Sequence, residues 1–422
     1  MEGIDRTLKL IKWRSLALGN QIVLQIAVPA LFIYQNDFYL YGIWLAVNSY
    51  SSFIAFFDLG FFAVIPTSAI VQSSGNLTLD NKSHLIAMRK FAIQISAFGI
   101  SLLLLILIFG RLLEVDLIKS SFFTYAVLSA INVFLILLLR YYEASFRSIN
   151  STYGFAILTI HGIATTISTI LVLLFRGNIL QILVLNLLIS IAFLFYYLIK
   201  GDAFDSNGIR SFNSIQSLKK FVKPGIAYQL FSFGYIMINQ GINIIIQHIG
   251  DYEVLGKLGA IRVIAGVFRQ ISSVIIASSI PQLSLLLKAE KFVEAGISFR
   301  YIKKIIYMIN SFVLLVLIMG LFTYFLQGNS SVNKIPIIVC VFFILSAFFD
   351  LPWNVWIMVT LSVNKHTNLG LRFLFSSLLT LVITAPAYQY AGLSGIAMIL
   401  LTQDLVMTRQ SIRQGKQILK LI

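Results

Sequence analysis

Apolar stretches of about 20 residues recur from one end of the 422-residue sequence to the other. This length fits a helix that crosses a hydrocarbon core of about 30 Å, because an α-helix rises about 1.5 Å per residue. Runs such as residues 101–109 do not alternate between apolar and polar side chains, as the strands of a membrane β-barrel would. With 58% hydrophobic residues, the chain carries more apolar surface than a soluble core can bury. The sequence therefore predicts an all-α polytopic membrane protein.

We predict about twelve transmembrane helices, of which the last is short. The first is as long as a spanning helix and precedes no small-residue cleavage site, which favours an anchor over a cleaved signal peptide. The predicted spans are 14–34, 39–58, 89–109, 121–140, 153–175, 179–199, 225–247, 255–280, 302–326, 335–359, 369–387 and 391–408.

The distribution of positive charge predicts the orientation of these spans. With the N-terminus placed in the cytoplasm, most of the 32 lysines and arginines fall in cytoplasmic loops. This asymmetry follows the positive-inside rule, places both termini in the cytoplasm and explains the net charge of +16 without a nucleic-acid partner. The five on the opposite side are Arg111, Lys119, Arg176, Lys257 and Lys334.

The longest polar stretch divides the spans into two sets of six. We expect an N-terminal six-helix lobe over 1–200, a cytoplasmic linker over 201–223 and a C-terminal six-helix lobe over 224–422. Because six is even, both halves begin on the same side of the membrane, so any internal symmetry would be a parallel repeat. The expected architecture is two lobes around a central cavity.

Two arginines, Arg262 and Arg269, interrupt the apolar run of the eighth span. Each costs roughly 2.5–3.5 kcal/mol at the centre of a helix on insertion scales, so each needs a partner. Their spacing places them on one helix face, with Arg262 near the midplane and Arg269 deeper toward the cytoplasm. One interpretation is that they bind an anionic substrate. The other is that they are structural, paired with Asp58 or Asp350 or reaching an interface.

Polar residues on the first, second and seventh spans repeat at helical intervals and predict a polar lumen. Their amides could join helices to each other, or bind a sugar, since amides donate and accept hydrogen bonds as hydroxyls do. Arg14 lies at a cytoplasmic end, where it also fits an ordinary topological role. The candidate substrate-binding residues are Arg14, Gln21, Asn48, Gln229, Gln240, Asn243, Arg262 and Arg269.

Three residues are candidates for coupling transport to an ion: Asp58, His161 and Asp350. His161 lies near the midplane of the fifth span, where it could relay a proton or serve as a hydrogen-bonded structural side chain. Asp404 lies close to the last cytoplasmic end and is given no weight.

Several chemistries have no signature in the sequence. It contains no G-x-x-x-x-G-K-[ST] nucleotide loop and no metal-ligand cluster, and Cys340 is its single cysteine. No carboxylate pair suited to glycosyl chemistry is visible among the 16 acidic residues. We therefore expect a transporter, not an enzyme, with no metal and no cofactor.

Short motifs add to this pattern: residues 41–44 (YGIW), Ser51 with Ser52, 58–61 (DLGF), 228–230 (YQL), 239–246, 250–256 (GDYEVLG), Arg262, 279–281 (SIP) and 390–397 (YAGLSGIA). Together with the spans, they resemble bacterial polysaccharide exporters, especially the O-antigen flippases of Wzx type. That superfamily also contains lipid II flippases and multidrug extruders.

The resemblance implies two six-helix bundles around a V-shaped cavity that opens alternately to each side. The implied substrate is an oligosaccharide linked to undecaprenyl pyrophosphate, such as an O-antigen repeat unit, moved from the inner to the outer leaflet of the bacterial cytoplasmic membrane. The implied partners are a coupling ion, proton or sodium, and polymerase and chain-length proteins of the same pathway.

Two other functions compete with this one. A drug or small-metabolite antiporter of the same fold should concentrate carboxylates in its lumen, whereas the deepest charges here are arginines. An O-antigen polymerase should carry a large external loop, and the predicted external loops are short.

Overall fold

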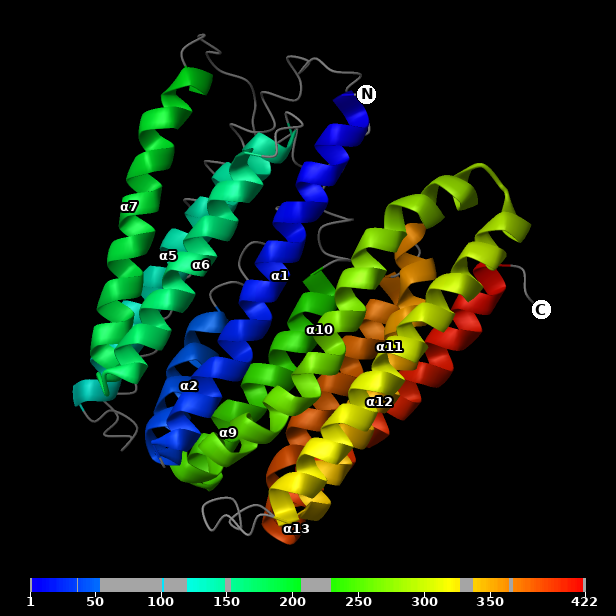
Figure 1. Cartoon of the computed structure of the whole chain (residues 1–422). Helices are drawn as coiled ribbons and strands as arrows, with labels where there is room; N and C mark the ends of the chain where they lie inside the picture. Colours follow the sequence, from blue (N-terminus) through cyan, green and yellow to red (C-terminus); the bar gives the residue numbers. More distant parts are fainter. Residues whose placement is uncertain are drawn as a thin grey trace. The chain divides into compact units, whose positions relative to one another are not determined.

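The computed structural model describes residues 2–35, 37–53, 101, 120–148, 153–205, 229–326, 337–363 and 367–419. Within these residues every regular element is helical (Figure 1). Residues 229–236 are also helical and lead into η2. The elements are α1 (Glu2–Tyr34), α2 (Phe38–Ser52), α5 (Ser120–Ser148), α6 (Tyr153–Leu174), α7 (Ile179–Asp205), η2 (Met237–Gly241), α9 (Ile242–Ile249), α10 (Tyr252–Lys288), α11 (Phe292–Leu326), α12 (Ile337–Ser362) and α13 (Thr367–Ile418).

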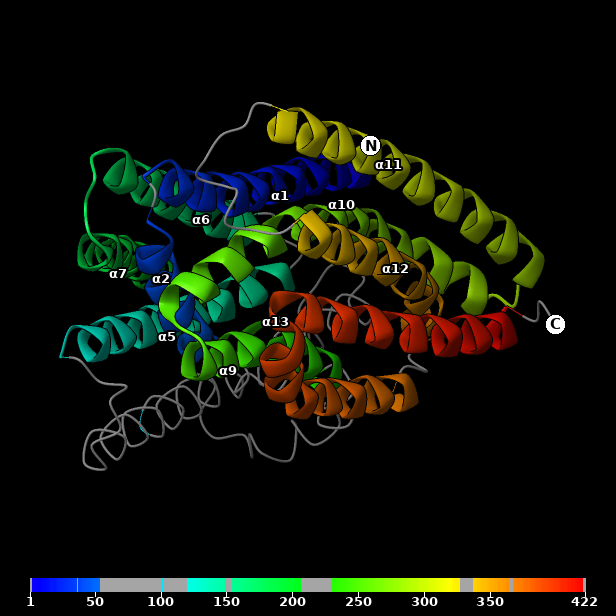
Figure 2. The ribbon, with the colours of Figure 1, turned by 90° about the horizontal axis from the view of Figure 1, so that it is seen from below.

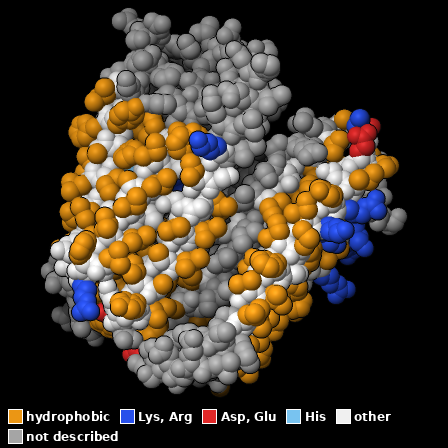
Figure 3. Space-filling model, in the orientation of Figure 1, with side chains coloured by type: hydrophobic (Ala, Val, Ile, Leu, Met, Phe, Trp, Pro, Cys, Tyr) orange, Lys and Arg blue, Asp and Glu red, His pale blue; other side chains and the backbone are white. Residues whose placement is uncertain are grey.

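Many of these helices have the length and composition of membrane spans. On the face shown in Figure 3, hydrophobic side chains cover the described helices along most of their length. On α11, for example, Phe312 is 67% exposed, as expected of a side chain that faces lipid. Six stretches of the described residues are long and apolar enough to cross a membrane: Ser15–Tyr34, Phe122–Arg140, Ala156–Leu174, Ile179–Tyr197, Ile338–Ser362 and Thr367–Ile418.

The predicted spans agree with helices wherever the structure describes them. The third span, 89–109, lies outside the described residues except for Ser101, and the second is described as far as residue 53. The total of twelve and the cytoplasmic placement of both termini stay predictions. The last two predicted spans are two helices within α13 that meet at a kink (Figure 2), where Gly392 adopts the non-helical angles φ 58° and ψ −144°.

The chain forms two compact units, one of residues 1–32 and 43–232 and one of residues 33–42 and 233–422. The second unit thus includes residues 33–42, which the predicted N-terminal lobe of 1–200 contained. Most of the predicted linker, from residue 206 onward, lies outside the described residues, so the predicted boundaries stay a prediction.

In the first unit, α5, α6 and α7 pack against one another around the buried side chains of Leu139, Ile157 and Tyr197. The end of α2 joins α5 through a hydrogen bond of 2.8 Å from Ser129 Oγ to Ser51 Oγ. These contacts bury apolar side chains from three long helices, while the hydroxyls of Ser51 and Ser129 bond to each other between α2 and α5.

In the second unit, α10 is the central element, since it packs against α9, α11 and α12, and α12 packs against α13. A tight turn joins α9 to α10, where the Asp251 carboxylate caps α10 by accepting a hydrogen bond of 2.6 Å from the Val254 amide. An apolar core lies where α10, α11 and α12 meet and includes Leu283, Phe299 and Val355.

The first residues of α2 cross the first turns of α10 at very short range. A Cβ atom at Gly256 would collide with the backbone carbonyl of Phe38, and one at Gly42 with the carbonyl of Tyr252. The rings of Tyr39 and Tyr252 pack edge to face beside this crossing, with centroids 5.4 Å apart. Glycine at both positions is what allows the two backbones to touch.

We predict that Gly256→Ala lowers the unfolding temperature of the purified protein, because its Cβ atom meets backbone and not a movable side chain. Overpacking of this kind costs about 1–3 kcal/mol. Thermal unfolding in detergent measures the effect. The matched control is Gly19→Ala on α1, where a Cβ atom has nothing within 4 Å. Equal unfolding temperatures for the Gly256→Ala variant and the wild type would contradict the packing argument.

Candidate functional site

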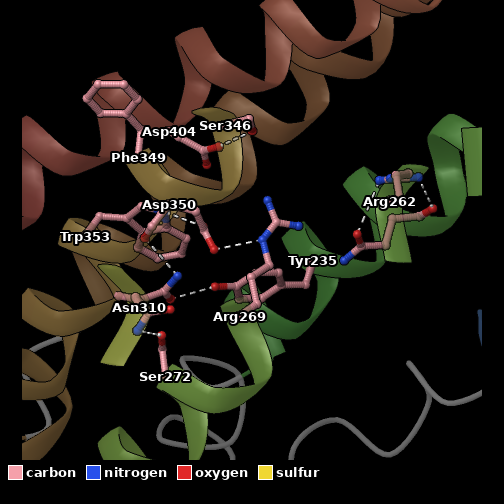
Figure 4. A network of polar contacts seen from close by, with 12 residues as sticks. Tyr235, Arg262, Arg269, Ser272, Asn310, Ser346, Phe349, Asp350, Trp353 and Asp404 are labelled. Carbon is pink, nitrogen blue, oxygen red and sulfur yellow. Dashed lines mark hydrogen bonds and ion pairs between the residues drawn. The ribbon is translucent and has the colours of Figure 1, made fainter. Parts of the chain in front are cut away.

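Arg262 on α10 reaches back to the π-helical turn that precedes α9 (Figure 4). Its Nη1 atom donates to the backbone carbonyl of Asn239 at 3.0 Å and to Asn243 Oδ1 at 2.9 Å. Its Nη2 atom donates to the carbonyl of Ile238 at 2.8 Å and to Asn239 Oδ1 at 3.2 Å. The guanidinium is therefore held in one orientation by four hydrogen bonds.

The π-helical turn explains why backbone carbonyls are available to Arg262. In an α-helix each carbonyl accepts from the amide four residues later, whereas a π-turn shifts this pairing by one residue and frees acceptors at its end. Ile238 and Asn239 lie within this turn, Met237–Gly241, and their carbonyls accept from Arg262. Arg262 and the turn thus stabilise each other.

The same turn corrects one expectation from the sequence. The predicted polar face of the seventh span assumes α-helical spacing throughout. The π-helical turn η2 interrupts that spacing between Ser232 and Asn243. As a result Asn239, which was not among the candidate site residues, contacts Arg262 directly. Gln240 is linked to Arg262 through Asn243, whose side-chain amide donates a hydrogen bond of 3.5 Å to Gln240. No feature of the sequence marks the π-turn.

All four acceptors of Arg262 are neutral. Among the residues that the structure describes, Arg262 forms no ion pair, so its positive charge is solvated by dipoles and not cancelled by a carboxylate. Arg262 is partly buried, and a cation withdrawn from water without a counter-ion is costly unless an anion arrives to share the site. The arrangement is chemically suited to a phosphate group, which guanidinium binds strongly.

Arg269, two turns further along α10, is paired. Its Nε atom lies 2.8 Å from Asp350 Oδ2 on α12. The other oxygen of Asp350 accepts a hydrogen bond of 2.7 Å from the indole of Trp353. This is the structural alternative that the sequence left open, with Asp350 as the partner. Asp58, the other carboxylate considered, lies outside the described residues.

Asp404, to which the sequence analysis gave no weight, lies in the same cluster as Arg269. It is 7% exposed and accepts a hydrogen bond of 2.7 Å from the Ser346 hydroxyl. It lines a cavity with Arg269, Asp350, Tyr235 and other residues of the second unit. The reasoning that singled out the arginines, a charge within an apolar span, applies equally to this aspartate and would have found it.

The other candidates have varied surroundings. His161 is buried in the first unit, where its Nε2 atom lies 3.0 Å from Ser190 Oγ, which fits the structural alternative.

The remaining substrate-binding candidates lie in the first unit. The side-chain amide of Asn48 donates a hydrogen bond of 2.8 Å to the carbonyl of Trp44 within its own helix. Gln21 is exposed on α1 and Gln229 is buried, both in the first unit. Arg14 lies on α1, but its side chain is outside the described part.

Thus the structure groups Arg262 with Asn243 and Gln240, and Arg269 with Asp350, all within the second unit. Among the described residues no group of three or more histidine, cysteine, aspartate or glutamate side chains could hold a metal ion.

No family model matches the sequence, and no curated protein matches it either. Solved structures do match. The multidrug transporter DinF-BH of the MATE family, in complex with R6G, has a TM-score of 0.66 and 14% identity, covering 98% of this chain and 97% of that one. An inward-facing multidrug resistance MATE transporter of the MOP superfamily has a TM-score of 0.64 and 12% identity, covering 96% and 94%. A MOP superfamily transporter from Pyrococcus furiosus, described with a binding pocket of reversed polarity, has 0.55 and 13%, covering 98% and 95%.

At these identities the likeness concerns the fold. The chain has the fold of the MATE transporters of the MOP superfamily and, with its apolar helices, is a multi-pass membrane protein. The superfamily named for these solved structures is the one that the sequence motifs resembled. The solved proteins named above are each described as transporters.

We predict that the Arg269–Asp350 pair shows strong coupling in a double-mutant cycle. Asp350→Asn or Arg269→Met alone removes the 2.8 Å ion pair and should cost about 1–3 kcal/mol of stability, less than in a dry core because the arginine side chain is 27% exposed. The double variant should be more stable than either single one. Additive losses in unfolding temperature would contradict the coupling.

Proposed function

We propose that the protein is an alternating-access flippase that moves an undecaprenyl-pyrophosphate-linked oligosaccharide from the inner to the outer leaflet of the bacterial cytoplasmic membrane. The observation that carries the proposal is the environment of Arg262. Its positive charge is held in place by neutral acceptors and has no carboxylate partner among the described residues. A pyrophosphate linkage supplies the missing negative charge.

The hydrogen bonds around Arg262 suit an exchange of ligands. When a phosphate oxygen approaches, the guanidinium can give up the side-chain oxygens of Asn239 and Asn243 and keep the backbone carbonyls of the π-turn. The displaced amides can rotate and donate their N–H groups to the same phosphate or to a sugar hydroxyl. The anion therefore replaces neutral acceptors by a charge-assisted bond while the arginine stays anchored.

The remaining parts of the substrate have suitable partners as well. Amides such as Gln240 match the hydroxyls of the oligosaccharide, and the lipid tail stays in the bilayer. Arg269 and the polar residues of the first unit, Arg14, Gln21, Asn48 and Gln229, remain candidates for further substrate contacts. Asp350, His161 and Asp58 remain candidates for coupling to a proton or sodium gradient. The polymerase and chain-length proteins of the same pathway would receive the product.

A second function, export of a drug or small metabolite by antiport, is also supported by an observation. The second unit buries two carboxylates, Asp350 and Asp404, and carboxylates suit cationic substrates. One of the solved proteins of the same fold is a multidrug transporter in complex with R6G. Against this, Asp350 is already paired with Arg269, and Arg262 would repel a cationic substrate. We therefore prefer the anionic, lipid-linked substrate.

We predict a graded response at Arg262 in a host strain that depends on this protein for surface polysaccharide. Arg262→Ala should abolish polysaccharide display, and Arg262→Lys should retain part of it, since lysine keeps the charge but loses the fork of donors. Display is measured by immunoblotting, with protein level measured in parallel. The matched control is Arg300→Ala, which removes an exposed cation on α11. Full display by the alanine variant at normal protein level would rule out the role of Arg262.

Deletion of the gene should separate the candidate functions. For a flippase, lipid-linked repeat units should accumulate on the cytoplasmic leaflet, where a membrane-impermeant probe added outside does not label them. If repeat units reach the outer leaflet but stay unjoined, a polymerase is indicated. If polysaccharide is normal and the strain becomes sensitive to cationic compounds, the antiporter is indicated.

A further inference from the structure

Three ionisable side chains from three different helices line one cavity in the second unit: Arg269 on α10, Asp350 on α12 and Asp404 on α13. The phenol of Tyr235 lines the same cavity, which is also bordered by the amide of Gln403. Figure 4 shows the two carboxylates on the same side of the Arg269 guanidinium. The cluster holds one cation and two carboxyl groups.

The two carboxyl groups differ in the donors that they meet. Both oxygens of Asp350 accept from N–H groups, those of Arg269 and Trp353, and such groups can only donate. These contacts fit an ionised Asp350. The Trp353 indole also donates toward Asp404, one oxygen of which is bonded to the Ser346 hydroxyl. A hydroxyl can donate to a carboxylate or accept from a carboxylic acid. Asp404 can therefore exist in either protonation state without losing this contact.

The charge of the cluster favours one bound proton. Arg269 balances one carboxylate, so ionisation of both would leave an uncompensated negative charge on buried side chains, which are 2% exposed at Asp350 and 7% at Asp404. Neutralising Asp404 removes that charge. The free volume that water could occupy in the cavity is about 10 Å³. That is about enough for one water molecule, through which a proton could arrive.

Arg269 has further N–H donors with which it can bind a second carboxylate. Its Nε atom binds Asp350, whereas its two terminal nitrogens, Nη1 and Nη2, form no hydrogen bond with the described residues. They can turn to Asp404 when that carboxyl is ionised. The Asp350 carboxylate would keep the indole of Trp353 as a donor throughout.

We propose that Asp404 is a proton-binding site, and that Arg269 pairs with Asp350 alone when Asp404 is protonated and with both carboxylates when it is not. In the binding step a proton from hydronium adds to an Asp404 oxygen and leaves water; no electrons are transferred. Use of this proton to drive transport rests on the proposed function, whereas the binding itself does not.

The test is an infrared pH titration of the purified, reconstituted protein without substrate, which follows the carbonyl stretch of protonated carboxyl groups. The wild type should show a protonated-carboxyl band that disappears as pH rises. Asp404→Asn should lack it, and Asp404→Glu should restore a titrating band at a displaced frequency. The matched control is Glu294→Gln, which removes an exposed carboxylate paired with Lys291 and should leave the band unchanged. Thermal unfolding confirms that each variant is folded.

Two further variants test the exchange of Arg269. In Asp350→Asn the arginine is left with Asp404 as its carboxylate, so the band should be absent at neutral pH. In Arg269→Gln neither carboxyl has a cation, so the band should grow. A band that survives in Asp404→Asn would overturn the proposal. So would its loss on adding sodium at constant pH, because a metal cation would then be the ligand. Since no cargo is present, these outcomes are independent of the substrate.

Discussion

Two partly buried arginine side chains in one apolar helix need polar partners, and the second unit is organised around the ways in which these partners are supplied. Arg262 is satisfied by dipoles: the carbonyls of a π-turn and the amides of Asn239 and Asn243. Arg269 is satisfied by charge, through Asp350. These bonds fix α10 to the segment before it and to α12, which adds directional contacts to helices whose apolar packing alone specifies orientation weakly.

The different solutions give the two arginines different chemistry, although they lie on the same helix. A cation paired with a buried carboxylate offers little net attraction to an anion, because the carboxylate already occupies that role. A cation held by neutral dipoles keeps its charge and is oriented in advance, so that less conformational entropy is lost when an anion binds. The contrast favours Arg262 over Arg269 for the proposed substrate contact, and the cluster around Arg269 for the proposed proton binding.

Sequence reasoning located the helices well because the thickness of the bilayer sets the length of a membrane span. The kink at Gly392 lies close to the predicted break between the last two spans. It also found both arginines and Asp350, since a charge in an apolar run is visible without a structure. Asn239 was missed because a π-turn changes the number of residues per turn, and no local pattern reveals it. Asp404 was missed because its depth was judged from the end of its span and not from the helices that cover it.

The position of the two sites on α10 constrains how they can influence each other. Arg262 and Arg269 are seven residues apart, about 10 Å along the helix axis. At that distance one unit of charge changes the energy of another by about 1–2 kcal/mol at an effective dielectric constant near 20. Protonation of Asp404 makes the cluster more positive and so strengthens anion binding at Arg262, and linkage requires the reverse as well. The direct field thus favours proton and anion binding together. If protons enter as the cargo leaves, the opposite coupling has to come from a change in conformation that separates the two sites, because the field alone cannot provide it.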